Sequence, residues 1–192
     1  MIATDRYQKV QVGSLAELRG WLEANHQRDE GVWLVRFKQT VPTKFVDRLD
    51  ALDELLCFGW IDGIARKLDD ERTMQLITPR RQEAWSQSYK LRVASLEAEG
   101  RMRPAGLAAV GRSKDLGLWA AYETVDALAV PEDVEHALAT APGAIAWFAS
   151  SAPSYRRNVL RWIHSAKRAM TRERRIVELV EASRAGVKLP QM

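Results

Sequence analysis

The sequence predicts an α+β protein: a small N-terminal antiparallel sheet with flanking helices, followed by a C-terminal all-helical part. Two observations predict this class. Short segments before residue 80 are rich in the β-branched and aromatic residues that favour strands, whereas apolar residues after residue 84 recur at helical spacing. We therefore expect residues 1–83 to form the sheet-containing part and residues 84–192 the helical part, packed together as one compact unit.

Local signals predict the elements of the first part. Ser14 and Glu17 form a capping box, which is typical of a helix start, and Gly59 is placed to end a later helix as its C-cap. An acidic turn separates two segments that are too short for helices, which indicates a pair of antiparallel strands. The predicted elements are a helix to about residue 26, a strand over 32–38, a helix over 47–58, and strands over 60–68 and 72–78.

The second part is predicted to be helical throughout. Prolines stand at the start of several of its segments, where the fixed φ and the missing N–H of proline are tolerated in a helix. Thr171 can cap the last helix. The other helices are predicted over residues 84–99, 104–116, 131–140, 142–150 and 153–168.

The composition excludes several classes of protein. A single cysteine rules out an internal disulfide, and the three histidines stand too far apart for a zinc-like cluster, so we expect no metal and no cofactor. Residues 1–10 lack the apolar segment of a signal peptide, and no run approaches the roughly 20 apolar residues of a membrane span. We therefore expect a cytoplasmic protein.

The charge is unevenly distributed. Residues 151–192 carry ten Lys and Arg against three Asp and Glu, a net charge of +7, whereas residues 1–150 carry a net charge of −3. Such an asymmetry points either to an anionic partner or to packing against an acidic face of the protein itself.

The most distinctive motif runs from Cys57 to Gly63 and reads Cys-Phe-Gly-Trp-Ile-Asp-Gly. Further motifs are Thr-Pro-Arg-Arg at 78–81, Trp-Ser at 85–86, Ala-Lys at 166–167 and Thr-Arg at 171–172, with Trp33, Lys38 and Glu54 at matching positions. In this order the chain resembles, from about Trp21 to Gly186, the YdeI/OmpD-associated family of bacteriocin-protection proteins. Other members carry Asn three residues after the serine of Trp-Ser. This chain has Tyr89 there, so any polar contact at that place must be rebuilt or absent.

The resemblance implies a cytoplasmic binding protein with a role in tolerance to bacteriocins or antimicrobial stress. The residues suggest a cleft between the sheet and the helical part that binds a small anionic ligand, because Arg80 and Arg81 precede a helix whose first N–H groups would complete an anion site. The candidate ligand-binding residues are Lys38, Trp60, Asp62, Arg80, Arg81, Trp85 and Ser86.

Three of these residues, and Cys57 of the same region, also have a structural interpretation. Asp62 can form a turn or pair with Arg80 or Lys38, and Arg80 can pair with Asp62 or Glu54 while Arg81 stays solvated. Cys57 lies among apolar residues without a nearby base, so we expect a buried and unreactive thiol.

Two alternative functions remain. A basic stripe on the last two helices could bind nucleic acid or another polyanion, or it could be a solvated helix face. The stripe consists of Arg157, Arg161, His164, Arg168, Arg172 and Arg175. The other alternative is an enzyme that acts on a small anionic substrate in the same cleft, although the sequence offers no defensible set of acid, base and nucleophile.

Overall fold

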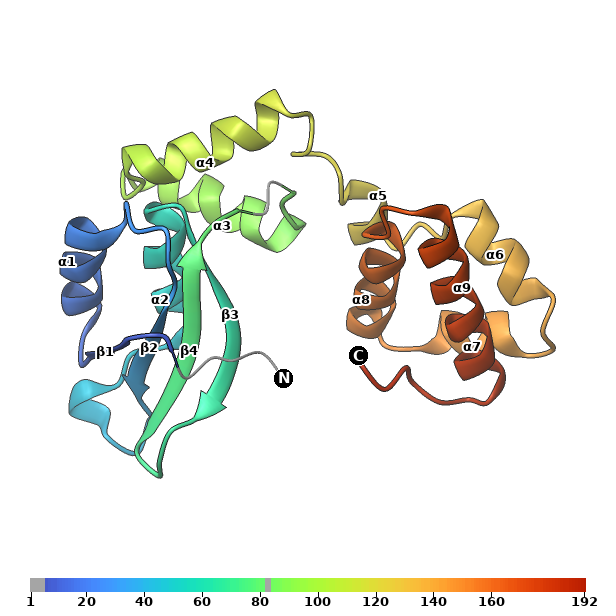
Figure 1. Cartoon of the computed structure of the whole chain (residues 1–192), viewed down its shortest axis with the longest axis horizontal. Helices are drawn as coiled ribbons and strands as arrows, with labels where there is room; N and C mark the ends of the chain where they lie inside the picture. Colours follow the sequence, from blue (N-terminus) through green and yellow to red (C-terminus); the bar gives the residue numbers. More distant parts are fainter. Residues whose placement is uncertain (1–5, 82–83) are drawn as a thin grey trace. The chain divides into compact units, whose positions relative to one another are not determined.

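The computed structural model describes residues 6–81 and 84–192; the expectation about residues 1–10 therefore falls partly on residues that lie outside this description. The chain folds as two compact units, divided between Ala120 and Ala121 (Figure 1). The sequence-based boundary lay at residues 83 and 84. The structure groups residues 84–120 with the sheet, because Val93 and Val110 belong to the same apolar core as the strands.

The first unit is built on a four-stranded sheet. Its strands are β1 (Lys9–Val12), β2 (Val32–Phe37), β3 (Trp60–Lys67) and β4 (Arg72–Pro79), in the order β1-β2-β4-β3. The antiparallel pairs β2/β4 and β3/β4 confirm the predicted sheet, but β1 pairs with β2 in parallel, so the sheet is mixed. The sequence prediction missed β1, although its polar and apolar residues alternate as in a strand, because this alternation extends over only four residues.

Helices pack on the sheet through one apolar core. They are α1 (Leu15–Asn25), α2 (Arg48–Cys57), α3 (Gln87–Ala98) and α4 (Pro104–Asp115), with a short 3-10 turn at Pro42–Lys44. Val32 and Leu34 alternate along β2 and therefore point to the same face, where they meet buried leucines of α1 and α2. The C-cap of α2 is Phe58 rather than the predicted Gly59, which follows it with a φ of +73° in the left-handed conformation that commonly ends a helix.

The second unit is helical, as predicted. It contains α5 (Glu123–Asp126), α6 (Glu132–Ala139), α7 (Ala144–Ser150), α8 (Pro153–His164) and α9 (Ala169–Arg184) around its own apolar core. The sequence prediction missed α5, which is a single turn. It was also wrong about the cap of the last helix, because Arg168 is the N-cap of α9 and Thr171 lies inside the helix.

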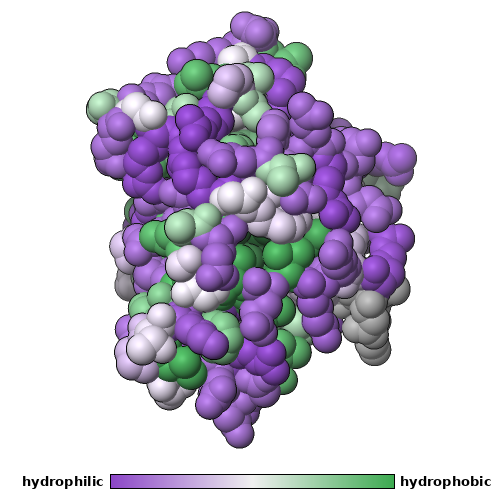
Figure 2. Space-filling model, turned by 90° about the vertical axis from the view of Figure 1, so that its left-hand side faces the viewer, coloured by the Kyte–Doolittle hydropathy of each residue, from purple (hydrophilic) through white to green (hydrophobic). Residues whose placement is uncertain are grey.

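Among the helices of the described residues, none is both long enough and apolar enough to cross a membrane. Figure 2 shows one face of the molecule, on which hydrophilic side chains cover most of the surface and hydrophobic side chains gather around a hollow near the middle.

Candidate functional site

Asp62 of the Cys57–Gly63 motif lies at the centre of a partly buried polar cluster. Its Oδ1 accepts a hydrogen bond from the Tyr89 hydroxyl at 2.8 Å, and its Oδ2 accepts bonds from Gln75 Nε2 at 2.9 Å and Arg48 Nη1 at 3.1 Å. The three donors come from α3, β4 and α2. Three donors on one carboxylate fix its position, so the cluster connects four elements.

Tyr89 is the residue at which the sequence analysis expected a polar contact to be either rebuilt or absent. Burial raises the pKa of its hydroxyl to about 12, and the hydrogen bond to the Asp62 carboxylate acts in the same direction. The polar contact at this position is therefore present in this chain, with a phenol as its donor.

Arg36 extends the cluster along β2. Its Nη1 donates to the Val46 carbonyl at 2.8 Å and its Nη2 donates to Gln75 Oε1 at 3.4 Å, while burial lowers the pKa of its guanidinium. The side chains of the cluster are closely packed, and their hydrogen bonds connect the sheet to the helices.

Arg80 and Arg81 lie in different surroundings. The Arg80 guanidinium is buried 3.8 Å from the centre of the Trp85 ring, and it donates to the Ala84 carbonyl at 2.7 Å. Arg81 is exposed and donates to the Asp29 carbonyl at 2.8 Å. The expected shared anion site of the two arginines is therefore not assembled.

The expected ion pairs of this region are different ones. Asp62 pairs with Arg48 rather than with Arg80 or Lys38. Glu54 is held by Arg19 at 2.7 Å and Arg101 at 2.9 Å. Arg48 and Glu54 both belong to α2, so the packing of this helix selects the ion-pair partners. The order of residues in the sequence does not reveal that packing.

The remaining expected cleft residues are spread over the first unit. Lys38 donates to the carbonyls of Asp69 and Asp70 in the β3–β4 turn, at the opposite end of β4 from Arg80. Trp60 is fully buried and donates to the His26 carbonyl at 3.0 Å.

Trp85 and Ser86 precede α3 rather than lying in its first turn. Trp85 is fully buried, and Ser86 Oγ lies 3.0 Å from Ser88 Oγ. The structure therefore brings Asp62, Arg80 and Trp85 to one region around Tyr89, but as packed side chains, and it leaves Lys38 apart.

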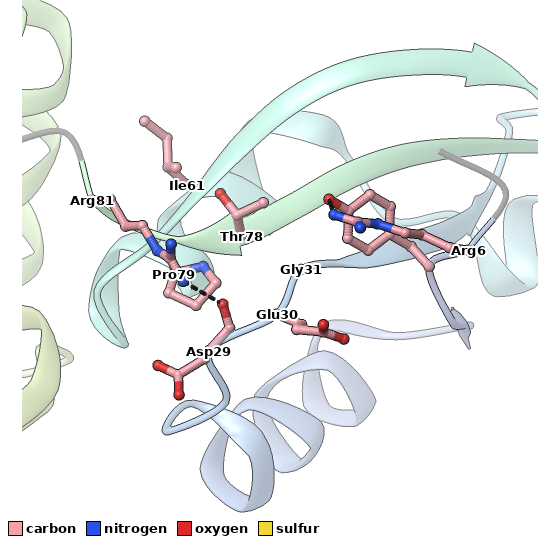
Figure 3. A pocket seen from close by; sticks show the side chains of 9 residues that line it. Arg6, Asp29, Glu30, Gly31, Ile61, Thr78, Pro79 and Arg81 are labelled. Atoms are coloured by element: carbon pink, nitrogen blue, oxygen red, sulfur yellow. Dashed lines mark hydrogen bonds between the residues drawn. The ribbon is translucent and has the colours of Figure 1, made fainter. Parts of the chain in front are cut away.

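A surface pocket of about 550 Å³ lies beside Arg81 (Figure 3). Its lining includes Ile61, Thr78 and Pro79 of the two paired strands and residues 29–31 of the loop before β2. Gly31 is required there, because a Cβ at this position would lie 2.6 Å from both the Ile77 carbonyl oxygen and the Thr78 methyl group. Close contact between loop and strand thus forms the floor of the pocket.

Charged and polar groups flank this floor. Figure 3 shows Arg81 at one side and Arg6 at the other, and Tyr7 also lines the pocket. The Arg6 guanidinium donates to the Tyr7 hydroxyl at 3.2 Å, and this bond raises the pKa of Arg6. Arg81 makes no ion pair with a carboxylate among residues 6–81 and 84–192, so its charge is available to a ligand.

Of the seven expected ligand-binding residues, this pocket contains only Arg81. Thr78 lies in the same Thr-Pro-Arg-Arg motif, but strand alternation does not place it on the side of Arg81, because the two residues are three positions apart. Nothing in the sequence indicated that Arg6, Tyr7 and Gly31 line the pocket, because the order of the strands in the sheet brings them there.

The basic stripe of the second unit is largely used inside the unit. Residues 121–150 hold five carboxylates and no Lys or Arg. Asp126 forms an ion pair with Arg161, and Asp133 binds Arg172 through two bonds of 2.7 and 2.9 Å. Of the two explanations for the charge asymmetry, packing against an acidic face accounts for these two arginines.

The other stripe residues differ in their contacts. Arg175 donates to the Trp162 carbonyl, and the His164 ring contacts Tyr122 edge-on with 5.7 Å between ring centres. The side chains of Arg157 and Arg168 make neither a hydrogen bond nor an ion pair with any residue that the structure describes.

Cys57 is fully buried in the first core, and burial raises the pKa of its thiol. A high thiol pKa disfavours the reactive thiolate, in agreement with the expectation of a structural cysteine.

Comparison with known families divides the chain in two. Residues 10–109 match a family described as a domain of unknown function (DUF8412), and residues 127–186 match the family described as Bacteriocin-protection, YdeI or OmpD-Associated. No curated protein and no solved structure matches the chain. The motifs at 57–63 and 78–81 fall in the first of these segments. Through residues 10–109, more than half of its length, the chain belongs to a domain family whose function is unknown, and its residues 127–186 match the YdeI/OmpD-associated bacteriocin-protection family.

Proposed function

We propose that this protein binds a small ligand through an anionic group of that ligand. The site is the surface pocket lined by Ile61, Thr78 and Arg81, which we call the Arg81 pocket. The observation that supports this proposal is a cation without a carboxylate partner among the described residues, placed beside a preformed pocket of about 550 Å³. That volume lies within the range of roughly 300–1,000 Å³ that is usual for small-molecule sites. Arginine suits the task, because its planar group binds carboxylates and phosphates through two parallel bonds.

Binding can be tested by titrating the isotope-labelled full chain with acetate and with inorganic phosphate while the amide signals of Gly31 and Thr78 are followed by NMR. We expect saturable shifts of both signals, and their loss in Arg81→Gln. The matched control is Arg184→Gln, which removes an exposed charge in the second unit and should leave the titration unchanged. Shifts that persist in Arg81→Gln would contradict the proposal.

We further propose a cytoplasmic role in tolerance to bacteriocins or other antimicrobial stress, in which the bound ligand sets the activity of the protein. Support comes from the description of the family that matches residues 127–186. A cytoplasmic protein can influence such tolerance only indirectly, through regulation, envelope metabolism or a bound partner.

The role can be tested in a host that lacks its own copy of the gene. Survival under bacteriocin exposure should be restored by the wild type and by Arg184→Gln, and restored less by Arg81→Gln at equal protein level. Equal protection by all three would separate the stress role from the pocket.

A further inference from the structure

The two faces of the sheet differ in what lies against them. Val32 and Leu34 point to the side of the helices and belong to the first apolar core, whereas Trp33 and Val35 alternate with them along β2 and lie outside that core. The other strands extend this second side, which we call the outer sheet face. It consists of the odd-numbered residues of β1 and β2, the even-numbered residues of β4, and Ile61 and Arg66 of β3.

The strand positions of the outer sheet face hold three cations and no carboxylate. Arg72 is balanced by Asp69, with 2.6 Å between Nη2 and Oδ2. Lys9 forms no ion pair with a carboxylate in the part of the chain that the structure describes, and both Lys9 and Arg66 are exposed. Because β1 and β3 are the outer strands, these two cations flank a largely apolar strip on β2 and β4.

Cations also lie over the aromatic rings of this face. Arg66 lies over Trp33 with 5.5 Å to the ring centre, and Lys44 lies over Phe37 with 5.3 Å. Trp33 is only 2% exposed, so a ligand reaches the guanidinium above it rather than the ring itself. Glu17 lines the same hollow as Lys44 and offsets part of its charge. The positive charge that a ligand meets on this face therefore lies mainly at its two edges.

This combination fits an extended polyanion that carries flat groups. Three strand spacings separate β1 from β3, about 14 Å in all, so one small anion does not reach both edges. A single-stranded nucleic acid has phosphates for the two cations, and its bases stack on guanidinium planes as well as on aromatic rings. A duplex keeps its bases inside, and an acidic peptide lacks a flat group beside each negative charge.

We propose that the outer sheet face binds single-stranded nucleic acid, with a base stacked on Arg66 and a phosphate at Lys9. This goes beyond the proposed function, because neither residue lines the Arg81 pocket. The contacts are to the backbone and to the faces of the bases, so the binding has little sequence preference.

The test follows the fluorescence anisotropy of a labelled oligothymidylate of about twelve nucleotides as the full chain is added. We expect saturable binding with a log–log salt slope of about −1.4, which is about −0.7 for each of two neutralised phosphates. The corresponding duplex should bind more weakly, and polyglutamate should not displace the oligonucleotide at equal charge. A duplex that binds as tightly, or displacement by polyglutamate, overturns the stacking and assigns the face to an acidic partner.

Variants of β3 locate the contact. Arg66→Gln should weaken binding at least about fivefold, the loss of one stacked base. Arg66→Lys keeps the charge without the plane, so it should keep the salt slope and still bind more weakly than the wild type. Lys67→Gln is the matched control and should bind like the wild type, because Lys67 is the next residue of β3, points to the opposite face and pairs with Asp70.

Three results would overturn the proposal: no binding at low salt, equal binding by Arg66→Gln and Lys67→Gln, or a loss of binding only in Arg157→Gln, which would place the site on the basic stripe. Arg66→Gln should leave the acetate titration of the Arg81 pocket unchanged, so the two proposals fail separately.

Discussion

At the scale of single residues, the Asp62 carboxylate shows how burial changes the value of a contact. Two of its partners differ mainly in exposure: Tyr89 is partly buried, with its pKa raised to about 12, whereas 54% of the Arg48 side chain is exposed. Water competes with the exposed ion pair much more strongly than with the buried hydrogen bond. The two contacts should therefore contribute unequally to stability.

We expect Tyr89→Phe to lower the stability of the first unit by about 1.5–3 kcal/mol, because a buried charged acceptor loses a donor while the ring remains. Arg48→Ala removes a donor from the same carboxylate and should cost less than about 1 kcal/mol. Hydrogen exchange of the β4 amides measures both. Equal costs would show that the phenol hydroxyl is not a significant support of Asp62.

Asp133 and Arg172 make a pH-dependent contact in the second unit. The hydrogen bonds from Arg172 hold the pKa of the Asp133 carboxyl below its ordinary value of 3.8. A carboxyl with a depressed folded-state pKa stabilises the protein above its ordinary pKa, and this contribution disappears as the pH falls through the folded-state value. The window therefore lies below about pH 4.

We expect Arg172→Gln to destabilise α6 and α9 at pH 7 and to become indistinguishable from the wild type at the acidic end of a pH series. Arg174→Gln is the control, since its 3.7 Å pair with Glu178 is 71% exposed on the arginine side and should matter at no pH. Hydrogen exchange of the α6 and α9 amides reports the difference. A destabilisation by Arg172→Gln that persists unchanged at low pH would assign its effect to packing.

At the scale of elements, α4 lies directly against the end of α2. A Cβ on Gly106 would lie 2.4 Å from the Cys57 carbonyl oxygen and 2.7 Å from that of Leu56. The backbone carbonyls of α2 cannot move aside as a flexible side chain would, so the two helices can approach this closely only at glycine.

Gly106→Ala should therefore destabilise the first unit by about 1–3 kcal/mol through overpacking. Gly111→Ala is the matched control in the same helix, because nothing lies within 4 Å of its added Cβ. It should stabilise by about 0.5–1 kcal/mol, the usual preference of a helix interior for alanine over glycine. Thermal unfolding of the two variants checks the sign, and a stabilised Gly106→Ala would contradict the close approach.

At the scale of the whole molecule, the described residues form two separate apolar cores. One extends from Val12 to Val110 and the other from Val125 to Leu189. The sequence analysis expected one compact unit. The two possibilities differ in whether destabilising one core also destabilises the other.

We expect the two cores to respond independently. Leu56→Ala and Leu179→Ala each leave a cavity at a fully buried position. Each should lower the free energy of unfolding of the unit that carries it by about 2–5 kcal/mol. Hydrogen exchange over the full chain reads both units in one experiment. Loss of protection in both units after either substitution would favour a single cooperative unit.

Features that depend on neighbouring residues could be predicted from the sequence alone. The Ser14 cap, the Gly59 stop and the acidic β3–β4 turn all lie where local chemistry placed them. The periodic segments give their elements to within a few residues, and the burial of Cys57 follows from its apolar neighbours. The resemblance to the YdeI/OmpD-associated family was drawn from about residue 21 to residue 186, and that family matches residues 127–186, so the motifs at 57–63 and 78–81 lie outside the match.

Only the tertiary structure decided which remote residues meet. The parallel pairing of β1 with β2 brings Arg6 towards the end of β4, and this places it at the Arg81 pocket. Helix packing gives Asp62 its partner Arg48 and gives Arg172 its partner Asp133, although charge alone allowed many other pairs. The physical reason is that caps, turns and periods depend on contacts a few residues apart, whereas side-chain partners depend on the order of strands and on which helix faces lie together.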